Sequence, residues 1–359
     1  MKKAKKVTFE GWKNCIEISS GKFRVIVSTE IGPRVIGAFY DKSKNLFHVD
    51  PALAGTKAEK GWVNYGGHRL WHAPETKERT YEPDNGENKV TVIETEEGGY
   101  EFLTPPNPVT GITKSLAVIP YDEETFQVIH TIRNDGVWEV EAAAWALSVM
   151  APGGVAVAPQ NKNEFALLPS TFYSLWPYTK MNDPRITWGD EFLMVRQDPK
   201  AKGPMKVGFN CQDGWLAYIN QGVAFIKQFI YEEDETYPDN GCSVEIYTNK
   251  DMLEAETLSP LMLLAPGDEI THTELWSAIP TDAVPKTEAD VKELFCGCEC
   301  DDECDDECSC SCGHDHAAKK TKKSAAKAEK KAPAKAEKKA PVKAEKKAPA
   351  GKKAAKAKK

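Results

Sequence analysis

Short β-type stretches separated by turn signals run through most of this 359-residue chain and limit what it can fold into. The stretch Lys22–Val27 alternates polar and apolar residues, which is typical of a strand with one buried face. No convincing amphipathic helix precedes the stretch 288–291. Many strands at regular spacing favour an all-β sandwich or barrel. The other β-rich stretches are Arg34–Tyr40, Lys89–Glu94, Ser115–Pro120, Phe126–Arg133, Glu139–Met150, Val223–Tyr231, Ser243–Thr248 and Thr271–Ala278, with turns at 84–86, 134–136, 152–154, 239–241 and 266–268.

The charge of the chain changes sign near its end. Residues 319–359 hold eighteen Lys and three Glu, a net charge of +15, so residues 1–318 carry −22 of the overall −7. An acidic body repels nucleic acid and anionic membranes, whereas a basic tail attracts both. We expect three parts: a β-sandwich domain over 1–286, a short helix and Cys-rich segment over 287–318, and a disordered tail over 319–359.

No targeting or membrane signal is visible in the sequence. The basic start MKKAKK is followed by VTFEGWKNC instead of an apolar run, and no stretch of eighteen apolar residues exists. We therefore expect a cytoplasmic protein without a transmembrane segment. Cys15, Cys211 and Cys242 are scattered, which is no disulfide framework, and we expect them to be small core residues.

The densest polar motif is GGHRLWHAPE at residues 66–75. His68, Arg69, Trp71, His72 and Glu75 supply hydrogen-bond donors, a flat stacking face and a carboxylate, which are the groups that a polyol site needs. The Gly-Gly start and the proline at 74 favour an extended stretch over a helix, so alternate positions 68, 70 and 72 would align. The alternative is that these residues only hold a loop in place.

Two further motifs carry carboxylates. In YPDNGCSVEIY, Asp239 lies in a hairpin turn and Glu245 lies on the strand face opposite the apolar positions 244 and 246. In LEAETLSPL, Glu254 and Glu256 share one strand face, about 6–7 Å apart. Like charges at that range raise one carboxyl pKa and make a usable acid or base. Lys227, within the apolar run AFIKQFI, is a candidate partner for one of them; the alternative is an exposed pair.

The order of these motifs resembles the galactose mutarotase-like (aldose 1-epimerase-like) superfamily. The resemblance rests on VIVSTEIGPRVIGAFYDKSKNLF at 25–47 and EAETLSPLMLLAPGDEITHTELW at 254–276, together with GGHRLWHAPE and YPDNGCSVEIYTN. The resemblance covers about 270 residues. Within the superfamily, the chain most resembles a bacterial family known only as a domain of unknown function. It implies a β-supersandwich whose concave sheet face binds a sugar ring.

The resemblance also implies roles for particular residues. In aldose 1-epimerases a Glu near the C-terminal end removes the anomeric proton and a His donates to the ring oxygen. Glu256 stands at the Glu position, with Glu254 as the competing choice. The strand AAAWALSVMAPGG has Trp145 and a serine where the acid His would be, so we expect His68 or His72 to supply the acid.

Three functions follow from the resemblance. The first is an epimerase-like enzyme in which Arg34, Arg69 and Trp71 hold the ring, and these arginines would also suit a phosphorylated or acidic sugar. The second is a sugar lyase or a hydrolase-associated activity. The third is a non-catalytic carbohydrate-binding module. No cofactor is expected for the β-domain.

The segment 296–316 is rich in cysteine and acidic residues. It holds seven Cys, two His and eight acidic residues, a density that resembles metallothionein-like thiolate clusters for Zn²⁺ or Cu⁺. The alternative is a reduced acidic linker. The expected ligands are Cys296, Cys298, Cys300, Cys304, Cys308, Cys310, Cys312, His314 and His316.

The last segment repeats KAEKKAPA-type octamers from 327 to 350. These repeats have no apolar face to bury and a proline in every octamer, so we expect disorder. The tail would contact nucleic acid or anionic surfaces non-specifically, or fold back on the acidic body.

Overall fold

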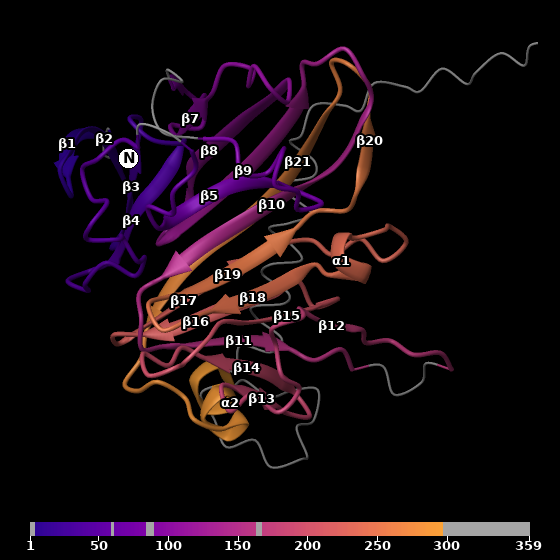
Figure 1. Cartoon of the computed structure of the whole chain (residues 1–359). Helices are drawn as coiled ribbons and strands as arrows, with labels where there is room; N and C mark the ends of the chain where they lie inside the picture. Colours follow the sequence, from indigo (N-terminus) through magenta and orange to yellow (C-terminus); the bar gives the residue numbers. More distant parts are fainter. Residues whose placement is uncertain (1–3, 59–60, 84–89, 163–166, 297–359) are drawn as a thin grey trace, which may run out of the picture.

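Two large antiparallel β-sheets pack face to face and form the body of the protein, as the computed structural model shows (Figure 1). The structure describes residues 4–58, 61–83, 90–162 and 167–296. The all-β prediction is therefore confirmed for this part of the chain, while the Cys-rich segment from 297 onward and the basic tail lie outside the described residues.

The first sheet, called the site sheet, contains the strands of all three polar motifs. Its hydrogen-bonded order begins at the N-terminal strand and places β5 beside β10 and β19. In that order the strands are β1 (Lys5–Phe9), β2 (Trp12–Ser20), β3 (Phe23–Ser28), β4 (Arg34–Tyr40), β5 (Gly67–Ala73), β10 (Val140–Met150), β19 (Leu253–Leu258), β18 (Val244–Thr248), β15 (Met205–Phe209) and β12 (Tyr173–Leu175), with β20 (Met262–Leu264) paired to β10.

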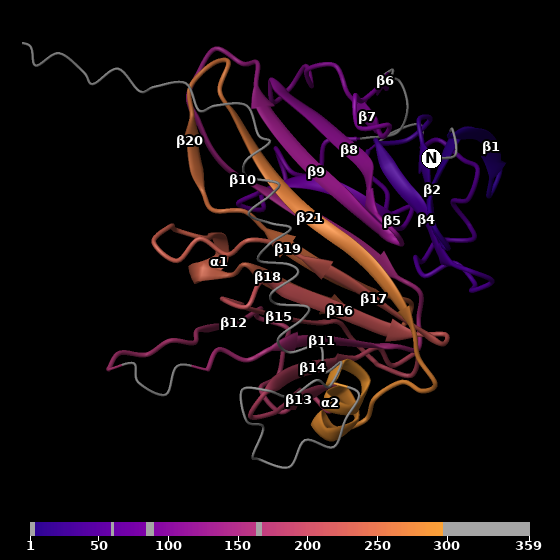
Figure 2. The same cartoon turned by 180° about the vertical axis from the view of Figure 1, so that it is seen from behind.

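The second sheet, called the back sheet, covers one face of the site sheet (Figure 2). In order its strands are β13 (Ile186–Trp188), β14 (Phe192–Arg196), β11 (Val155–Pro159), β16 (Trp215–Asn220), β17 (Val223–Gln228), β21 (Glu269–Pro280), β9 (Thr125–Asn134), β8 (Ile112–Asp122), β7 (Tyr100–Leu103) and β6 (Thr91–Glu94).

Two short helices complete the described elements: α1 (Pro238–Gly241) at the edge of the site sheet and α2 (Glu288–Cys296) on the back sheet. Val291 of α2 is buried against the face of the back sheet that points away from the site sheet. The Glu288 carboxylate accepts hydrogen bonds from the backbone N–H groups of Glu191 and Phe192 at 2.7 and 2.8 Å. Within the described part of the chain, neither helix has the length and apolar character that crossing a bilayer requires.

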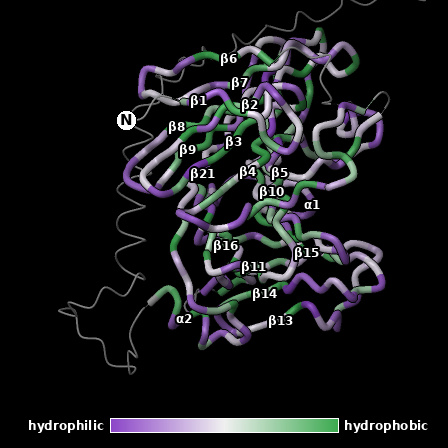
Figure 3. The backbone as a smooth tube through the Cα atoms, turned by 90° about the vertical axis from the view of Figure 1, so that its left-hand side faces the viewer, coloured by the Kyte–Doolittle hydropathy of each residue, from purple (hydrophilic) through white to green (hydrophobic). Residues whose placement is uncertain are grey.

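The main hydrophobic core fills the space between the sheets, where the apolar strand segments gather while hydrophilic residues concentrate in the loops (Figure 3). Phe23, Phe47, Phe126, Phe225 and Trp276 pack there edge to face, with ring centroids 5.2–6.3 Å apart. The three body cysteines are buried and unpaired, as predicted: Cys15, Cys211 and Cys242.

A polar network crosses this core and links the two sheets. Since a carbonyl oxygen only accepts, His130 donates through Nδ1 to the His272 carbonyl at 2.9 Å. Burial lowers the pKa of His130, so this imidazole is neutral. Because the proton of His130 is on Nδ1, His130 Nε2 accepts from His68 Nε2 at 2.7 Å, and His68 Nδ1 accepts from the Ser148 hydroxyl at 2.9 Å. The strands β5 and β10 are thereby tied to the back sheet.

The same network contains a buried ion pair between Lys227 and Glu274, with Nζ 2.8 Å from Oε1. Lys227 also donates to the carbonyls of Ala146 and Ala255 at 3.1 Å, directly beneath the β10–β19 pair. Burial raises the pKa of Glu274, but the charge of the Lys227 ammonium and the hydrogen bond that it donates outweigh burial and lower that pKa to about 2. Thr257 of β19 donates to the same carboxylate at 2.5 Å.

Replacing Lys227 by alanine leaves the Glu274 carboxylate buried without its cation. We expect the free energy of unfolding to fall by about 3–5 kcal/mol. Lys162→Ala is the matched control, because Lys162 is exposed and its pair with Glu191 is worth no more than about 1 kcal/mol. Urea unfolding monitored by tryptophan fluorescence measures both. Equal losses in the two variants would contradict the role given to the buried pair.

Candidate functional site

The site is built on the face of the site sheet that points away from the back sheet, here called the outer face. Successive side chains of a strand point to opposite faces, so the register decides which residues meet. Leu147 of β10 lies opposite Arg69 of β5 and also opposite Glu256 of β19, and Glu256 lies opposite Glu245 of β18. One row across four strands therefore brings an arginine and two carboxylates together.

Lys206 of β15 lies between the two carboxylates. Its ammonium is 2.6 Å from Glu245 Oε2 and 2.9 Å from Glu256 Oε2, and all three side chains are buried. Trp145 donates through its indole N–H to the same Glu256 oxygen at 2.8 Å. The ammonium also lies 4.5 Å from the ring centroids of Trp145 and Trp176, within cation–π range.

Burial and the shared cation act in opposite directions on these groups. Burial raises the pKa of Glu245 well above its ordinary value, and the Lys206 ammonium only partly offsets this. The pKa of Glu256 is raised by burial in the same way. Burial lowers the pKa of Lys206, but the two carboxylates outweigh it and raise it above its usual range. With one cation for two carboxylates, one carboxyl holds a proton more readily than an exposed glutamate does.

The second half of the outer face is centred on Arg69. Its Nη2 lies 3.0 Å from Glu254 Oε1, and the Asn64 amide donates to the same oxygen at 3.3 Å. The guanidinium carbon lies 4.2 Å from the Trp71 ring centroid and 5.4 Å from that of Trp62. Aromatic faces therefore border this charge pair.

Several buried polar atoms on this face have no hydrogen-bond partner among the described residues. They are Glu256 Oε1, Glu245 Oε1, Arg69 Nε and Nη1, and Trp62 Nε1. A buried polar group without a partner costs about 1–3 kcal/mol, more when it is charged. Donors and acceptors left unpaired beside aromatic faces indicate a place where a polar ligand completes the network.

Asp239 and Glu75 lie at the border of this face. Asp239 lines a cleft of about 150 Å³ that also contains Trp176, whose ring contacts Lys206. The turn carrying Asp239 is held in the left-handed region, with φ of 52° at Asp239 and 66° at Asn240. Glu75 is exposed and accepts a hydrogen bond from the Tyr81 hydroxyl at 2.5 Å.

The structure corrects the expected acid partners of Glu256. His68 and His72 alternate with Arg69 and Trp71 on β5, so they face the back sheet while the acidic cluster faces away from it. Burial, with Lys114 and Arg79 nearby, lowers the pKa of His72 to about 3. The sheet itself separates both imidazoles from Glu256, and neither is placed to protonate a sugar bound there.

Lys227 and Arg34 also differ from expectation. Lys227 pairs with Glu274 between the sheets and not with Glu254 or Glu256. Arg34 is buried at the start of β4, where its guanidinium donates to the Gly66 carbonyl at 2.8 Å and lies 5.7 Å from the Tyr65 ring. Its contacts support the β4–β5 connection.

Sequence reasoning missed Lys206, Trp176 and Trp62. A signal for Lys206 was present, because it interrupts the otherwise apolar stretch Met205–Phe209. The two tryptophans come from loops, and nothing in their local sequence indicates a site.

One group of side chains has the composition of a metal site. Ligand atoms of His68, His130 and Glu274 lie within 4.8 Å of one another between the sheets. Each is already hydrogen bonded, and the Lys227 ammonium supplies the positive charge that Glu274 requires. We interpret the group as part of the inter-sheet network. The metal ligands predicted from Cys296 to His316 lie outside the residues whose side chains are described.

Two solved structures share this architecture. One is a "putative aldose 1-epimerase" from Klebsiella pneumoniae, with a TM-score of 0.52, 12% identity, and coverage of 83% of this chain and 87% of that chain. The chain has the galactose mutarotase-like fold. A galactose mutarotase-like protein from Lactobacillus casei gives a TM-score of 0.51 at 10% identity, covering 74% of this chain and 100% of its own. No protein-family model and no curated protein matches the sequence.

In this galactose mutarotase-like fold, Lys206 compensates the charge of two buried carboxylates, those of Glu245 and Glu256. We expect Lys206→Met to lower the free energy of unfolding by about 3–5 kcal/mol at pH 8, because two facing carboxylates then lack a cation. Without the Lys206 ammonium, the pKa values of Glu245 and Glu256 in the folded state lie above their values in the unfolded state. The variant therefore loses stability as the pH rises from the unfolded-state pKa to the folded-state pKa, and the loss is smaller at pH 5 than at pH 8.

Urea unfolding at the two pH values measures this effect. The control is Lys250→Met, because Lys250 and its partner Asp251 are exposed and their pair is worth no more than about 1 kcal/mol. A loss in Lys206→Met that does not change with pH would contradict the account of the carboxyl pair.

Proposed function

We propose that this protein binds a sugar on the outer face of the site sheet. The observation that carries the proposal is the set of unpartnered buried polar atoms on Arg69, Trp62 and Glu256. They lie among the aromatic rings of Trp71 and Trp145. A sugar offers hydroxyl groups that both donate and accept, and C–H groups that pack on aromatic faces.

The balance of charge favours a neutral sugar. Both cations on this face are already paired, Lys206 with Glu245 and Glu256, and Arg69 with Glu254. In the described part of the chain, three carboxylates therefore face two cations, which leaves no unmatched positive charge there for a phosphate or a carboxylate group. Arg34, expected from the sequence as a second anion ligand, is engaged with the Gly66 carbonyl.

A second candidate, an aldose 1-epimerase-like reaction, is favoured by the facing carboxyls of Glu245 and Glu256. Each carboxyl has an oxygen within 3 Å of the Lys206 ammonium, so the two groups lie close enough to act on one sugar ring. Glu256 Oε1 is free to take the proton of the anomeric hydroxyl, as the resemblance implies. Glu245, whose pKa burial raises, would give its proton to the ring oxygen. The C1–O5 bond then breaks and gives the open-chain aldehyde, and the ring closes again when O5 attacks the other face of C1.

Sugar binding is tested with Arg69→Ala. The variant removes the guanidinium that pairs with Glu254, and we expect affinity for neutral monosaccharides to fall by about tenfold or more, since charged hydrogen bonds contribute about 1.5–3 kcal/mol. Arg133→Ala is the matched control, because Arg133 is exposed and pairs with Asp135 on the back sheet. Saturation-transfer NMR over a panel of aldoses measures binding. Absence of binding by the wild-type protein to every aldose would refute the proposal.

Catalysis is tested with Glu256→Gln, which keeps the shape of the side chain but cannot take a proton. We expect anomer interconversion, followed by polarimetry, to slow by about 10²–10⁴-fold while sugar binding persists. A wild-type protein that binds sugars but leaves their anomer exchange unchanged would be a binding module. Cleavage of a glycosidic bond that depends on Glu256 would instead support a hydrolase or lyase reaction.

A further inference from the structure

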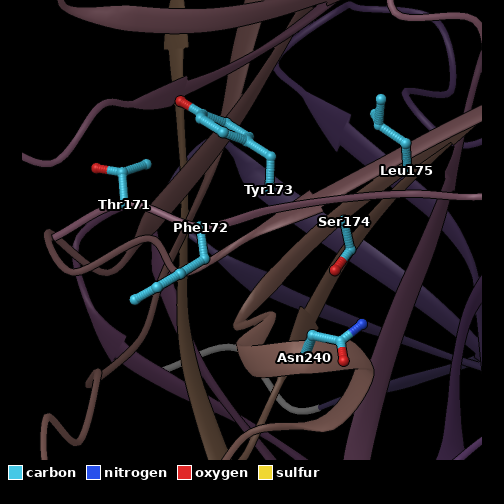
Figure 4. A pocket seen from close by; sticks show the side chains of 6 residues that line it. All are labelled: Thr171, Phe172, Tyr173, Ser174, Leu175 and Asn240. Carbon is cyan, nitrogen blue, oxygen red and sulfur yellow. The ribbon is translucent and has the colours of Figure 1, made fainter. Parts of the chain in front are cut away.

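A cavity of about 540 Å³ lies at the edge of the site sheet, beside β12 and α1. It is lined by Thr171, Phe172, Tyr173, Ser174, Leu175 and Asn240. In Figure 4, Phe172 and Ser174 point to the side of Asn240, whereas Tyr173 and Leu175 point the opposite way. It shares Ser174, Leu175 and Asn240 with the neighbouring cleft of about 150 Å³. The two hollows therefore adjoin each other.

The cleft shares one side chain, Trp176, with the proposed sugar site. Trp176 and Asp239 line the cleft. The Trp176 ring lies 4.5 Å from the Lys206 ammonium, which in turn binds Glu245 and Glu256. Cavity, cleft and carboxyl pair thus follow one another along the same end of the site sheet.

The walls of the cavity have the chemistry of a second sugar subsite. Phe172 is 54% exposed, although large apolar rings are usually covered in a folded domain. The next residue, Tyr173, points the other way, and its ring stacks on Phe209 of the core with centroids 5.7 Å apart. Polar groups stand near Phe172: the Thr171 and Ser174 hydroxyls and the Asn240 amide. Among the described residues no lysine, arginine or carboxylate lines the cavity, so its chemistry suits an uncharged ligand that presents both hydroxyl and C–H groups.

The cavity wall is also held in place before any ligand binds. The backbone N–H of Phe172 donates to the Asn210 amide oxygen at 2.8 Å. The Ser174 hydroxyl donates to the Asp239 carbonyl at 2.6 Å, and β12 pairs with β15. An exposed ring on a fixed backbone reduces the entropy lost on binding, which is the property of a preorganised contact surface.

We propose that this cavity is a second sugar subsite and that the ligand is a neutral oligosaccharide of at least two units. One unit occupies the outer-face site at Glu256, and the next packs on Phe172. This inference rests on the proposed function, since it takes the outer face as the first subsite.

The test compares sugars of one type and increasing length. A glycan array of matched mono-, di- and trisaccharides of glucose, galactose, mannose, xylose and N-acetylglucosamine identifies the preferred series, and calorimetry then measures each affinity. We expect the disaccharide or trisaccharide to bind about tenfold more tightly than its monosaccharide, as one added aromatic contact allows. Phe172→Ala should remove this gain and leave monosaccharide affinity unchanged. The control is Trp138→Ala, because Trp138 is 80% exposed in the loop before β10.

The outcomes separate this inference from the proposed function. Equal affinity for monosaccharides and longer sugars, or a length preference that Phe172→Ala leaves intact, would overturn the second subsite alone. Absence of binding to any sugar would overturn both. Dimerisation of the wild-type protein that Phe172→Ala abolishes, seen by analytical ultracentrifugation, would assign the cavity to a second copy of the chain and also overturn the inference.

Discussion

The alternation of side chains along β5, β10 and β19 is the constraint on which the rest of this molecule depends. Each of these strands carries a polar group on both faces, for example His68 and Arg69 on β5, and Thr257 and Glu256 on β19. A shift of register by one residue would exchange the two faces. The same pairing therefore positions the inter-sheet network around Lys227 and the acidic cluster around Lys206.

The two buried lysines do different things for the protein. Lys227 joins the sheets, because it contacts Glu274 on one sheet and backbone carbonyls on the other. Lys206 holds together two carboxylates of the same face. Buried ion pairs add little net stability compared with apolar packing. The cluster at Lys206, which leaves Glu256 Oε1 unpaired, is thus better explained by a ligand than by stability.

The fold was predictable from local signals, because alternating stretches and turn residues report directly on strands. Strand alternation predicts that Glu254 and Glu256 share one face, whereas their clustering with Arg69 and Glu245 depends on the pairing of strands distant in sequence, and the roles of all four stay a prediction. His68 was expected to supply the acid because the strand AAAWALSVMAPGG has no His at the position that the resemblance implies. Strand alternation instead turns His68 to the face opposite Arg69 and Glu256. Lys206, Trp62 and Trp176 were not predictable, because only the pairing of distant strands and loops brings them to the site.

The central claim is that a sugar binds on the outer face of the site sheet, and the indole N–H signals of the nine tryptophans test it most directly. In a ¹H–¹⁵N spectrum recorded during titration with the tightest-binding sugar, the Trp145 and Trp62 signals should shift and saturate, because both indoles lie in the proposed site. The signals of Trp12 and Trp276, buried elsewhere, should stay in place. Saturable shifts at Trp12 or Trp276 without any at Trp145 and Trp62 would contradict the account.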